Sequence, residues 1–99
     1  MKNQSLIIEK KYLIFRDQAK NLSQIIQKKA KAEKDNAFFL DFSKTRFFSR
    51  SFIDELLNLI ADLKKKKIII NIINLNPSFK KIFQKIAEKK TEIEKELTI

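Results

Sequence analysis

The chain has 99 residues, of which 43% are hydrophobic, and its 22 Lys and Arg outnumber 12 Asp and Glu to give a formal net charge of +10. This composition suits one globular domain, and the absence of cysteine excludes a disulfide framework and thiolate metal ligands. Because glycine and histidine are also absent, glycine-rich phosphate loops and histidine general bases are excluded, and we expect a non-enzymatic protein without a cofactor.

The first elements are two short apolar runs, SLIIE and YLIF, which predict one or two strands. From Arg16 the apolar residues recur at helical spacing, which predicts a helix of about four turns. The predicted inward face of this helix consists of Ala19, Leu22, Ile25, Ile26 and Ala30. Residues 31–36, KAEKDN, are interpreted as its end and a connection.

The next run, AFFLDF at residues 37–42, is apolar almost throughout, which predicts a strand covered on both faces. Residues 43–51, SKTRFFSRS, predict a loop. Of the two aromatic residues in this loop, Phe47 and Phe48, we expect one to fill the core and the other to be exposed as an interface anchor.

The strongest helical pattern follows this loop. Ser51, with Asp54 three positions later, predicts an N-cap, and Glu55 adds negative charge to the predicted first turn. Lys64–Lys67 end the helix, where cations complement its negative end. The predicted apolar stripe consists of Phe52, Ile53, Leu56, Leu57, Leu59, Ile60 and Leu63.

The last elements are a β-branched strand, IIINIIN at residues 68–74, and a helix that begins with Asn76 as cap and Pro77 in the first turn. The residues predicted to face inward are Phe79, Ile82, Phe83 and Ile86. Ile93 and Leu97 continue a helical spacing, so residues 89–99 are predicted to be a helical extension or a tail.

Strands that alternate with helices predict an α/β fold in which residues 1–99 form a single small domain. The apolar strands indicate one open sheet with parallel central strands, and we expect the helices to pack mainly on one face. No apolar run reaches the ~20 residues of a membrane helix, and charges interrupt the apolar run at the start, so we expect a cytoplasmic protein that does not bind membranes.

Three segments resemble the STAS-like domain family of unknown function, which is related to sulphate transporter and anti-sigma factor antagonist domains. These segments are YLIFRDQAKNL, FFLDFSKTRFFSRSFIDELLNLI and IIINIINLNPSFKKIFQKI, and the resemblance covers about residues 12–88. The residues that carry it are Arg16, Ala19, Asp41, Phe42, Ser51, Phe52, Asp54, Glu55, Leu56 and Asn74.

This resemblance implies a bacterial regulatory module that acts by protein–protein interaction. Antagonist-type relatives compete for a histidine-kinase-like ATPase, and phosphorylation of a serine at the start of the helix after the central strand abolishes that binding. Ser51 lies closest to this position, with Ser49 beside it. The related antagonists have an acidic residue before the serine pair and a glycine after it, whereas Arg50 precedes Ser51 and Phe52 follows it here.

A phosphate on an N-cap serine would lie against free backbone N–H groups and the positive helix end, beside Asp54 and Glu55. The alternative is that Ser51 serves only as a cap. The predicted switch residues are therefore Ser51 and Ser49. The predicted partner-binding residues are Phe47, Phe48, Arg50, Phe52, Asp54 and Glu55.

Asp41, at the end of a predicted parallel strand, allows two interpretations. It could face a ligand crevice or bind Mg²⁺, or it could bond loop amides or pair with Arg46 or Arg50. We favour the second, since no other metal ligand is evident. Arg16 is expected to cap or pair near the first helix, and a partner contact stays open.

The alternative function is a nucleic-acid-binding domain, which the positive charge suggests. Its contacts would come from Lys28, Lys29, Lys64–Lys67, Lys80 and Lys81. Such binding would weaken steeply with salt, whereas binding to a protein would depend more on Phe and Ser side chains. A further alternative is a homo-oligomer formed through the loop and the tail, where Ile93, Leu97 and Ile99 need an apolar partner.

Overall fold

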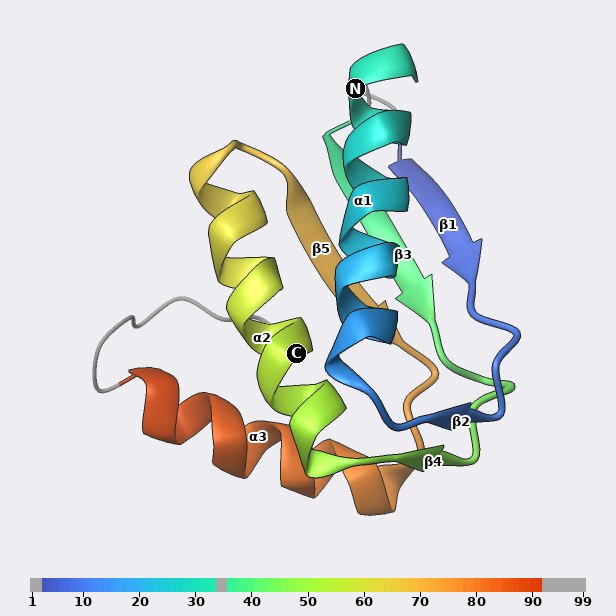
Figure 1. The fold of residues 1–99 in the computed structure, drawn as a ribbon, viewed down its shortest axis with the longest axis vertical. Coiled ribbons are helices and arrows are strands. Elements are labelled where there is room, and N and C mark those ends of the chain that lie inside the picture. The colour runs from blue at the N-terminus through green and yellow to red at the C-terminus, as the bar shows by residue number, and fades with distance from the viewer. Residues whose placement is uncertain (1–2, 34–35, 92–99) are drawn as a thin grey trace.

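The computed structural model describes residues 3–33 and 36–91 (Figure 1). The elements in chain order are β1 (Asn3–Ile7), β2 (Tyr12–Leu13), α1 (Arg16–Glu33), β3 (Ala37–Asp41), β4 (Phe47–Phe48), α2 (Arg50–Lys65), β5 (Ile69–Ile73) and α3 (Pro77–Thr91). The predicted α/β class is confirmed. The predicted contribution of Ile93 and Leu97 to the last helix lies outside the described residues.

Strands β1, β3 and β5 form a parallel sheet in that spatial order, with β3 at its centre. The register places Ser5, Phe39 and Asn71 in one row across the three strands. Helices α1 and α2 lie side by side over one face, while α3 crosses near the carboxyl ends of the strands (Figure 1). The predicted open sheet, with parallel central strands and helices mainly on one face, is therefore confirmed.

The side chains of the central strand alternate between the two faces of this sheet. Phe38 and Leu40 are fully buried beneath the helices, whereas Phe39 on the opposite face is only half-buried. The prediction that residues 37–42 are covered on both faces is wrong, because α1 and α2 cover only one face in the described part of the chain.

The segment predicted as a loop, residues 43–51, contains the short strand β4 and the first two residues of α2, so that prediction is wrong at four positions. Strand β4 pairs in parallel with β2, and Tyr12 lies opposite Phe47 in the register. Since β2 leads into α1 and β4 leads into α2, this pair places the first turns of the two helices close together (Figure 1).

The predicted inward faces of α1 and α3 each contain one wrong residue. Ile25 of α1 is 48% exposed and Ile82 of α3 is 41% exposed. Each lies at the margin of its apolar stripe, where one step of about 100° turns a side chain toward solvent. In α3 the buried position that the prediction missed is Ala87, which packs beside Phe83 and Ile86 in the core.

The predicted stripe of α2 is confirmed, with Leu59 partly buried and its other members fully buried. The helix ends in the hydrogen-bond pattern of a Schellman motif, in which Ile68 N donates to Leu63 O at 2.9 Å and Lys67 N donates to Lys64 O at 2.9 Å. Lys67 takes the left-handed position of this motif with φ of 64°, where glycine is the usual residue.

Candidate interaction site

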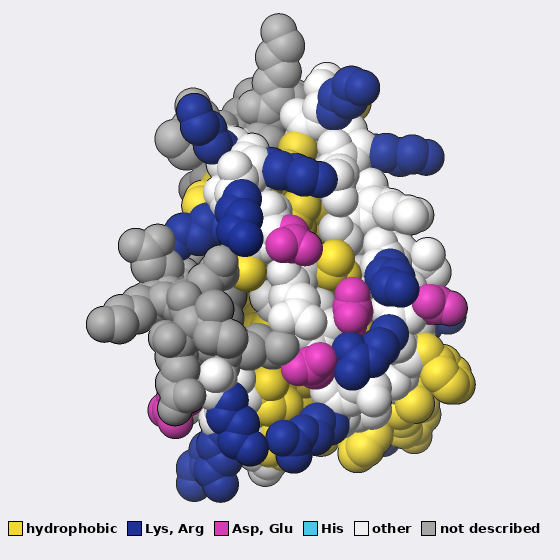
Figure 2. Space-filling model, turned by 60° about the vertical axis from the view of Figure 1, so that its left-hand side comes forward, with side chains coloured by type: hydrophobic (Ala, Val, Ile, Leu, Met, Phe, Trp, Pro, Cys, Tyr) yellow, Lys and Arg dark blue, Asp and Glu magenta, His cyan; other side chains and the backbone are white. Residues whose placement is uncertain are grey.

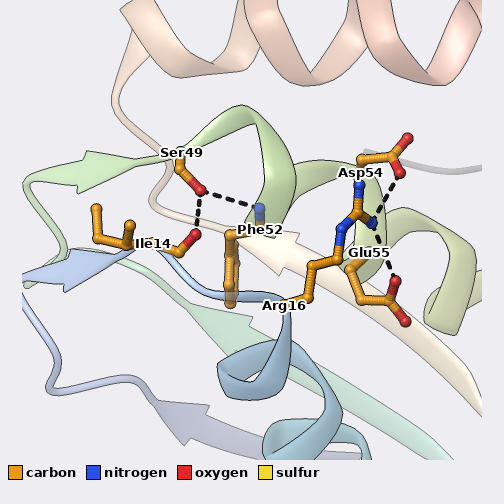
Figure 3. Close-up of polar contacts among 6 residues, drawn as sticks. All are labelled: Ile14, Arg16, Ser49, Phe52, Asp54 and Glu55. Atoms are coloured by element: carbon orange, nitrogen blue, oxygen red, sulfur yellow. Dashed lines mark hydrogen bonds and ion pairs between the residues drawn. The ribbon is translucent and has the colours of Figure 1, made fainter.

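The site is built around Ser49, which joins the start of α2 to the end of β2. The Ser49 hydroxyl accepts a hydrogen bond from Phe52 N at 3.0 Å and donates one to Ile14 O (Figure 3). Ser49 N donates to Leu13 O at 2.8 Å. Ser49 is therefore the N-cap of α2 and also a bridge between two segments that are 35 residues apart.

The prediction that Ser51 is the N-cap is wrong, because α2 begins at Arg50 and Ser51 is its second residue. Its side chain is exposed. Glu55 likewise lies beyond the first turn, which contains no acidic residue. Of the two predicted switch residues, Ser51 is thus accessible to a modifying enzyme, whereas the Ser49 hydroxyl already uses its donor and its acceptor in the fold.

Arg16 pairs with two carboxylates on α2. Its Nη1 lies 3.0 Å from Asp54 Oδ2 and 3.1 Å from Glu55 Oε1 (Figure 3). The hydrogen bond with Asp54 is the larger cause that raises the pKa of Arg16 above its ordinary value, and the hydrogen bond with Glu55 raises it further. The expectation that Arg16 pairs near the first helix is confirmed. Asp54 and Glu55, which were predicted to bind a partner, each have an internal partner in this structure.

The start of α1 is fixed by Gln18, which the sequence reasoning missed. Gln18 Oε1 accepts hydrogen bonds from Ile14 N at 2.8 Å and from Phe15 N at 2.9 Å. A glutamine three residues after the N-cap that reaches back to the N-cap amide is one half of a capping box. The backbone that presents Ile14 O to Ser49 is therefore held in place from both sides.

The two aromatic residues of β4 have different environments, as predicted. Phe48 is 3% exposed, and its ring centroid lies 5.1 Å from Phe42 and 5.2 Å from Phe83. Phe47 is 45% exposed. Phe52 is fully buried, so that neither it nor Phe48 is available to a partner, although both were predicted contacts.

Exposed aromatic residues gather at this junction. Of the ten aromatic residues, three are exposed: Tyr12 at 59%, Phe15 at 67% and Phe47 at 45%. All three belong to β2, to β4 or to the turn before α1, and Tyr12 lies opposite Phe47 in the strand register. We call the surface formed by these three residues with Arg50 and Ser51 the helix-start surface. Sequence reasoning missed Tyr12 and Phe15 because it assigned both to one short apolar run that predicts a strand.

A groove of about 700 Å³ lies next to the helix-start surface, between β4, the start of α2, and α3. Its apolar lining consists of Phe47, Phe48, Ile53, Phe79, Ile82 and Ile86. Its charged lining residues are Arg50, Lys85, Glu88 and Lys89. Figure 2 shows hydrophobic side chains between Lys and Arg side chains at the lower edge of this side of the molecule. The volume lies in the range of about 300–1,000 Å³ that is usual for binding pockets.

Asp41 acts on its own loop, which is the interpretation that the sequence favoured. Its Oδ1 accepts a hydrogen bond from Ser43 N at 2.8 Å. This bond is the main cause that lowers the pKa of Asp41, with smaller contributions from the Ser43 hydroxyl, Asn74 and Lys44. Asn74, at the end of β5, holds a left-handed φ of 57°. Among the described residues, no ion pair joins Asp41 to Arg46 or Arg50.

The lysines predicted to bind nucleic acid are divided between two ends of the molecule. Lys66 Nζ donates to Gln27 Oε1 at 3.2 Å, so the lysines at the end of α1 and those at the end of α2 lie at one end. Lys80 and Lys81 lie in the first turns of α3, at the opposite end (Figure 1). The fold therefore does not gather these side chains into one continuous patch.

Within residues 3–33 and 36–91, no group of three or more acidic side chains is placed to hold a metal ion. None of the helices described is both long and apolar enough to cross a membrane. Comparison of the chain with protein-family models, with curated proteins and with solved structures gives no match.

Proposed function

We propose that this chain is a non-enzymatic regulatory domain of the STAS-like type that binds a protein partner through the helix-start surface in the bacterial cytoplasm. The partner class implied by the resemblance is a histidine-kinase-like ATPase. The observation that carries the proposal is the gathering of all three exposed aromatic side chains at the starts of α1 and α2.

Exposed aromatic side chains are suited to this role because they bury a large area with little loss of conformational freedom on binding. Tyr12 and Phe47 also lie on a two-stranded pair whose next residues, Leu13 and Phe48, are buried in the core. The backbone beneath the exposed rings is thus held rigidly, which reduces the entropy lost on association.

The charges nearby indicate the chemistry of the partner. Arg46 and Arg50 are exposed on either side of β4, and Lys10 and Lys11 are exposed before β2. A partner that offers an apolar patch bordered by carboxylates would complement this surface, and long-range attraction would accelerate the encounter.

Ser51 gives this surface a chemical switch. On a helix, residue 51 shares a face with Asp54 and Glu55, which lie three and four positions later. A phosphate on Ser51 would bring about two negative charges next to the ion pairs of Arg16 and would compete for Arg16 and Arg50. The positive end of α2 would stabilise the phosphate, so that the modification changes the surface without unfolding the helix.

The proposal is tested by affinity capture from native cells with the wild type, Phe47→Ser and a matched control, Ile69→Ser. Ile69 is 41% exposed, similar to Phe47, but lies at the start of β5, at the end of the three-stranded sheet that is away from β4 (Figure 1). The proposal expects one protein to be retained by the wild type and by Ile69→Ser and lost with Phe47→Ser, with all three folded by circular dichroism. Retention of the same proteins by all three, or of salt-sensitive nucleic acid alone, would contradict it.

A further inference from the structure

The groove beside the helix-start surface combines an apolar floor with a mainly basic rim. Phe79, Ile82 and Ile86 of α3 and Phe47 of β4 supply apolar surface, and Ile82 is 41% exposed. Three of the four charged lining residues are basic and one is acidic, which leaves a net charge of +2 in the groove. Such a groove fits an apolar segment that carries carboxylates.

The chain itself contains a segment of this kind immediately after α3. Residues 92–99, EIEKELTI, hold three apolar residues, three glutamates and one lysine, for a net side-chain charge of −2. In an extended conformation Ile93, Leu97 and Ile99 point to one side, together with Lys95, and the three glutamates point to the other. The segment is therefore complementary to the groove in both apolar character and charge.

The distances allow the segment to reach the groove in the same molecule. Helix α3 ends at Thr91, two residues after the lining residue Lys89. From Lys89 back to Phe79 the helix rises about 15 Å, whereas eight extended residues span up to about 26–29 Å. Direct attachment gives an effective concentration of about millimolar order, which favours binding in the same molecule over binding to a second copy at micromolar concentrations.

We propose that residues 92–99 bind in the groove between α3 and β4 of their own chain and cover Phe47 and Arg50. The segment docks its apolar side chains on Ile82 and Ile86, and its glutamates face Arg50, Lys85 and Lys89. Because Phe47 and Arg50 also belong to the helix-start surface, the segment would compete with a partner there, a consequence that rests on the proposed function. The docking itself does not depend on that function.

The test uses a nitroxide spin label on Thr98→Cys in the full chain, which has no other cysteine. The amide signals of Phe47, Ile82 and Ile86 should be weaker with the oxidised nitroxide than with the reduced nitroxide. This loss of intensity should be the same at every protein concentration. In a mixture of isotope-free labelled protein and isotope-enriched wild type, the wild-type signals should keep their intensity. A loss of the wild-type signals in the mixture would assign the groove to a second copy and overturn the proposal. A loss spread evenly over the surface would also overturn it.

Two sets of variants identify the forces involved. Ile93→Ser combined with Leu97→Ser should abolish the loss of intensity, whereas Lys95→Ser should preserve it. Reversal of the rim charges with Lys85→Glu and Lys89→Glu should reduce this loss of signal intensity. Adding Glu92→Lys and Glu96→Lys to that variant should bring the loss back to its wild-type extent. An unchanged loss in the Ile93 and Leu97 variant would contradict the docking.

These results are separable from the proposed function. If the segment docks but no protein partner is captured, the proposed function fails and the docking stands. If both are correct, the Ile93 and Leu97 variant should capture more of the partner than the wild type.

Discussion

Replacing Ser49 with alanine tests the structural basis of the site, because two contacts depend on one hydroxyl. In the wild type the hydroxyl caps α2 through Phe52 N at 3.0 Å and donates to Ile14 O. In Ser49→Ala the Phe52 amide loses its cap, and the partly buried carbonyl of Ile14 loses its donor. The start of α2 and the end of β2 are then weakened together.

The two losses give the size of the effect. Removal of a serine N-cap costs about 1 kcal/mol, and loss of the second hydrogen bond costs about 1 kcal/mol more. Their sum, about 2 kcal/mol, lowers the melting temperature of a domain of this size by roughly 8–16 °C. Urea unfolding followed by circular dichroism measures the change in the free energy of unfolding.

The matched control is Ser51→Ala, two positions further along the same helix. Ser51 is exposed and lies after the cap, so its replacement should change the free energy of unfolding by no more than about 0.5 kcal/mol. If Ser51→Ala destabilises the protein as much as Ser49→Ala does, Ser49 is not the cap that joins these elements.

Three further predictions concern the fold. Phe83→Ala removes a fully buried ring that packs on Phe48 and should lower the free energy of unfolding by about 3–5 kcal/mol in urea titrations. Lys67→Gly relieves a left-handed backbone at φ of 64° and should raise that free energy by about 0.5–1 kcal/mol, whereas a decrease would contradict the role of this position. Hydrogen bonds lower the pKa of Asp41 in the folded protein below its ordinary value of 3.8. Its carboxylate therefore stabilises the fold fully above about pH 3.8, and this contribution is lost as the pH falls through the lower pKa of the folded state. Asp41→Asn should therefore flatten the stability curve below about pH 3.8 in unfolding measured across the acid range.

The fold could be predicted from the sequence to a large extent because its elements have clear local patterns. The stripe from Phe52 to Leu63 repeats at helical spacing, and the β-branched run before Asn74 has strand propensity. The order of strands and helices then restricts the sheet to parallel pairing. Errors arose at stripe margins, as at Ile25 and Ile82, where local pattern does not decide which side chain meets the neighbouring element.

The site could be predicted only in part, because its contacts join distant segments. Ser49 and Ser51 both precede a helical pattern, and local sequence favoured Ser51 through Asp54. The pairing of β2 with β4 decides between them, since it brings Ile14 O to the hydroxyl of Ser49 from 35 residues away. The same pairing leaves Tyr12 exposed, which an apolar run alone does not reveal.

The ion pairs of Arg16 show the same dependence on tertiary structure. Arg16 pairs at the start of its own helix as expected, but the sequence did not identify its partners, Asp54 and Glu55, which lie 38 and 39 residues later on α2. The groove is a similar case, because α3 and β4 meet only in the folded chain. The ion pairs and the groove therefore depend on packing between separate elements, which sequence periodicity does not predict.

We propose that negative charge at Ser51 switches the binding of a protein partner. The most direct test compares partner capture by the wild type, Ser51→Ala, Ser51→Asp and Ser78→Asp. Ser78 is an exposed serine at the second position of α3, as Ser51 is in α2, so it controls for charge at a helix start. We expect that Ser51→Asp alone loses the partner while its circular dichroism spectrum and melting temperature are retained. Equal capture by Ser51→Asp and Ser78→Asp would contradict it.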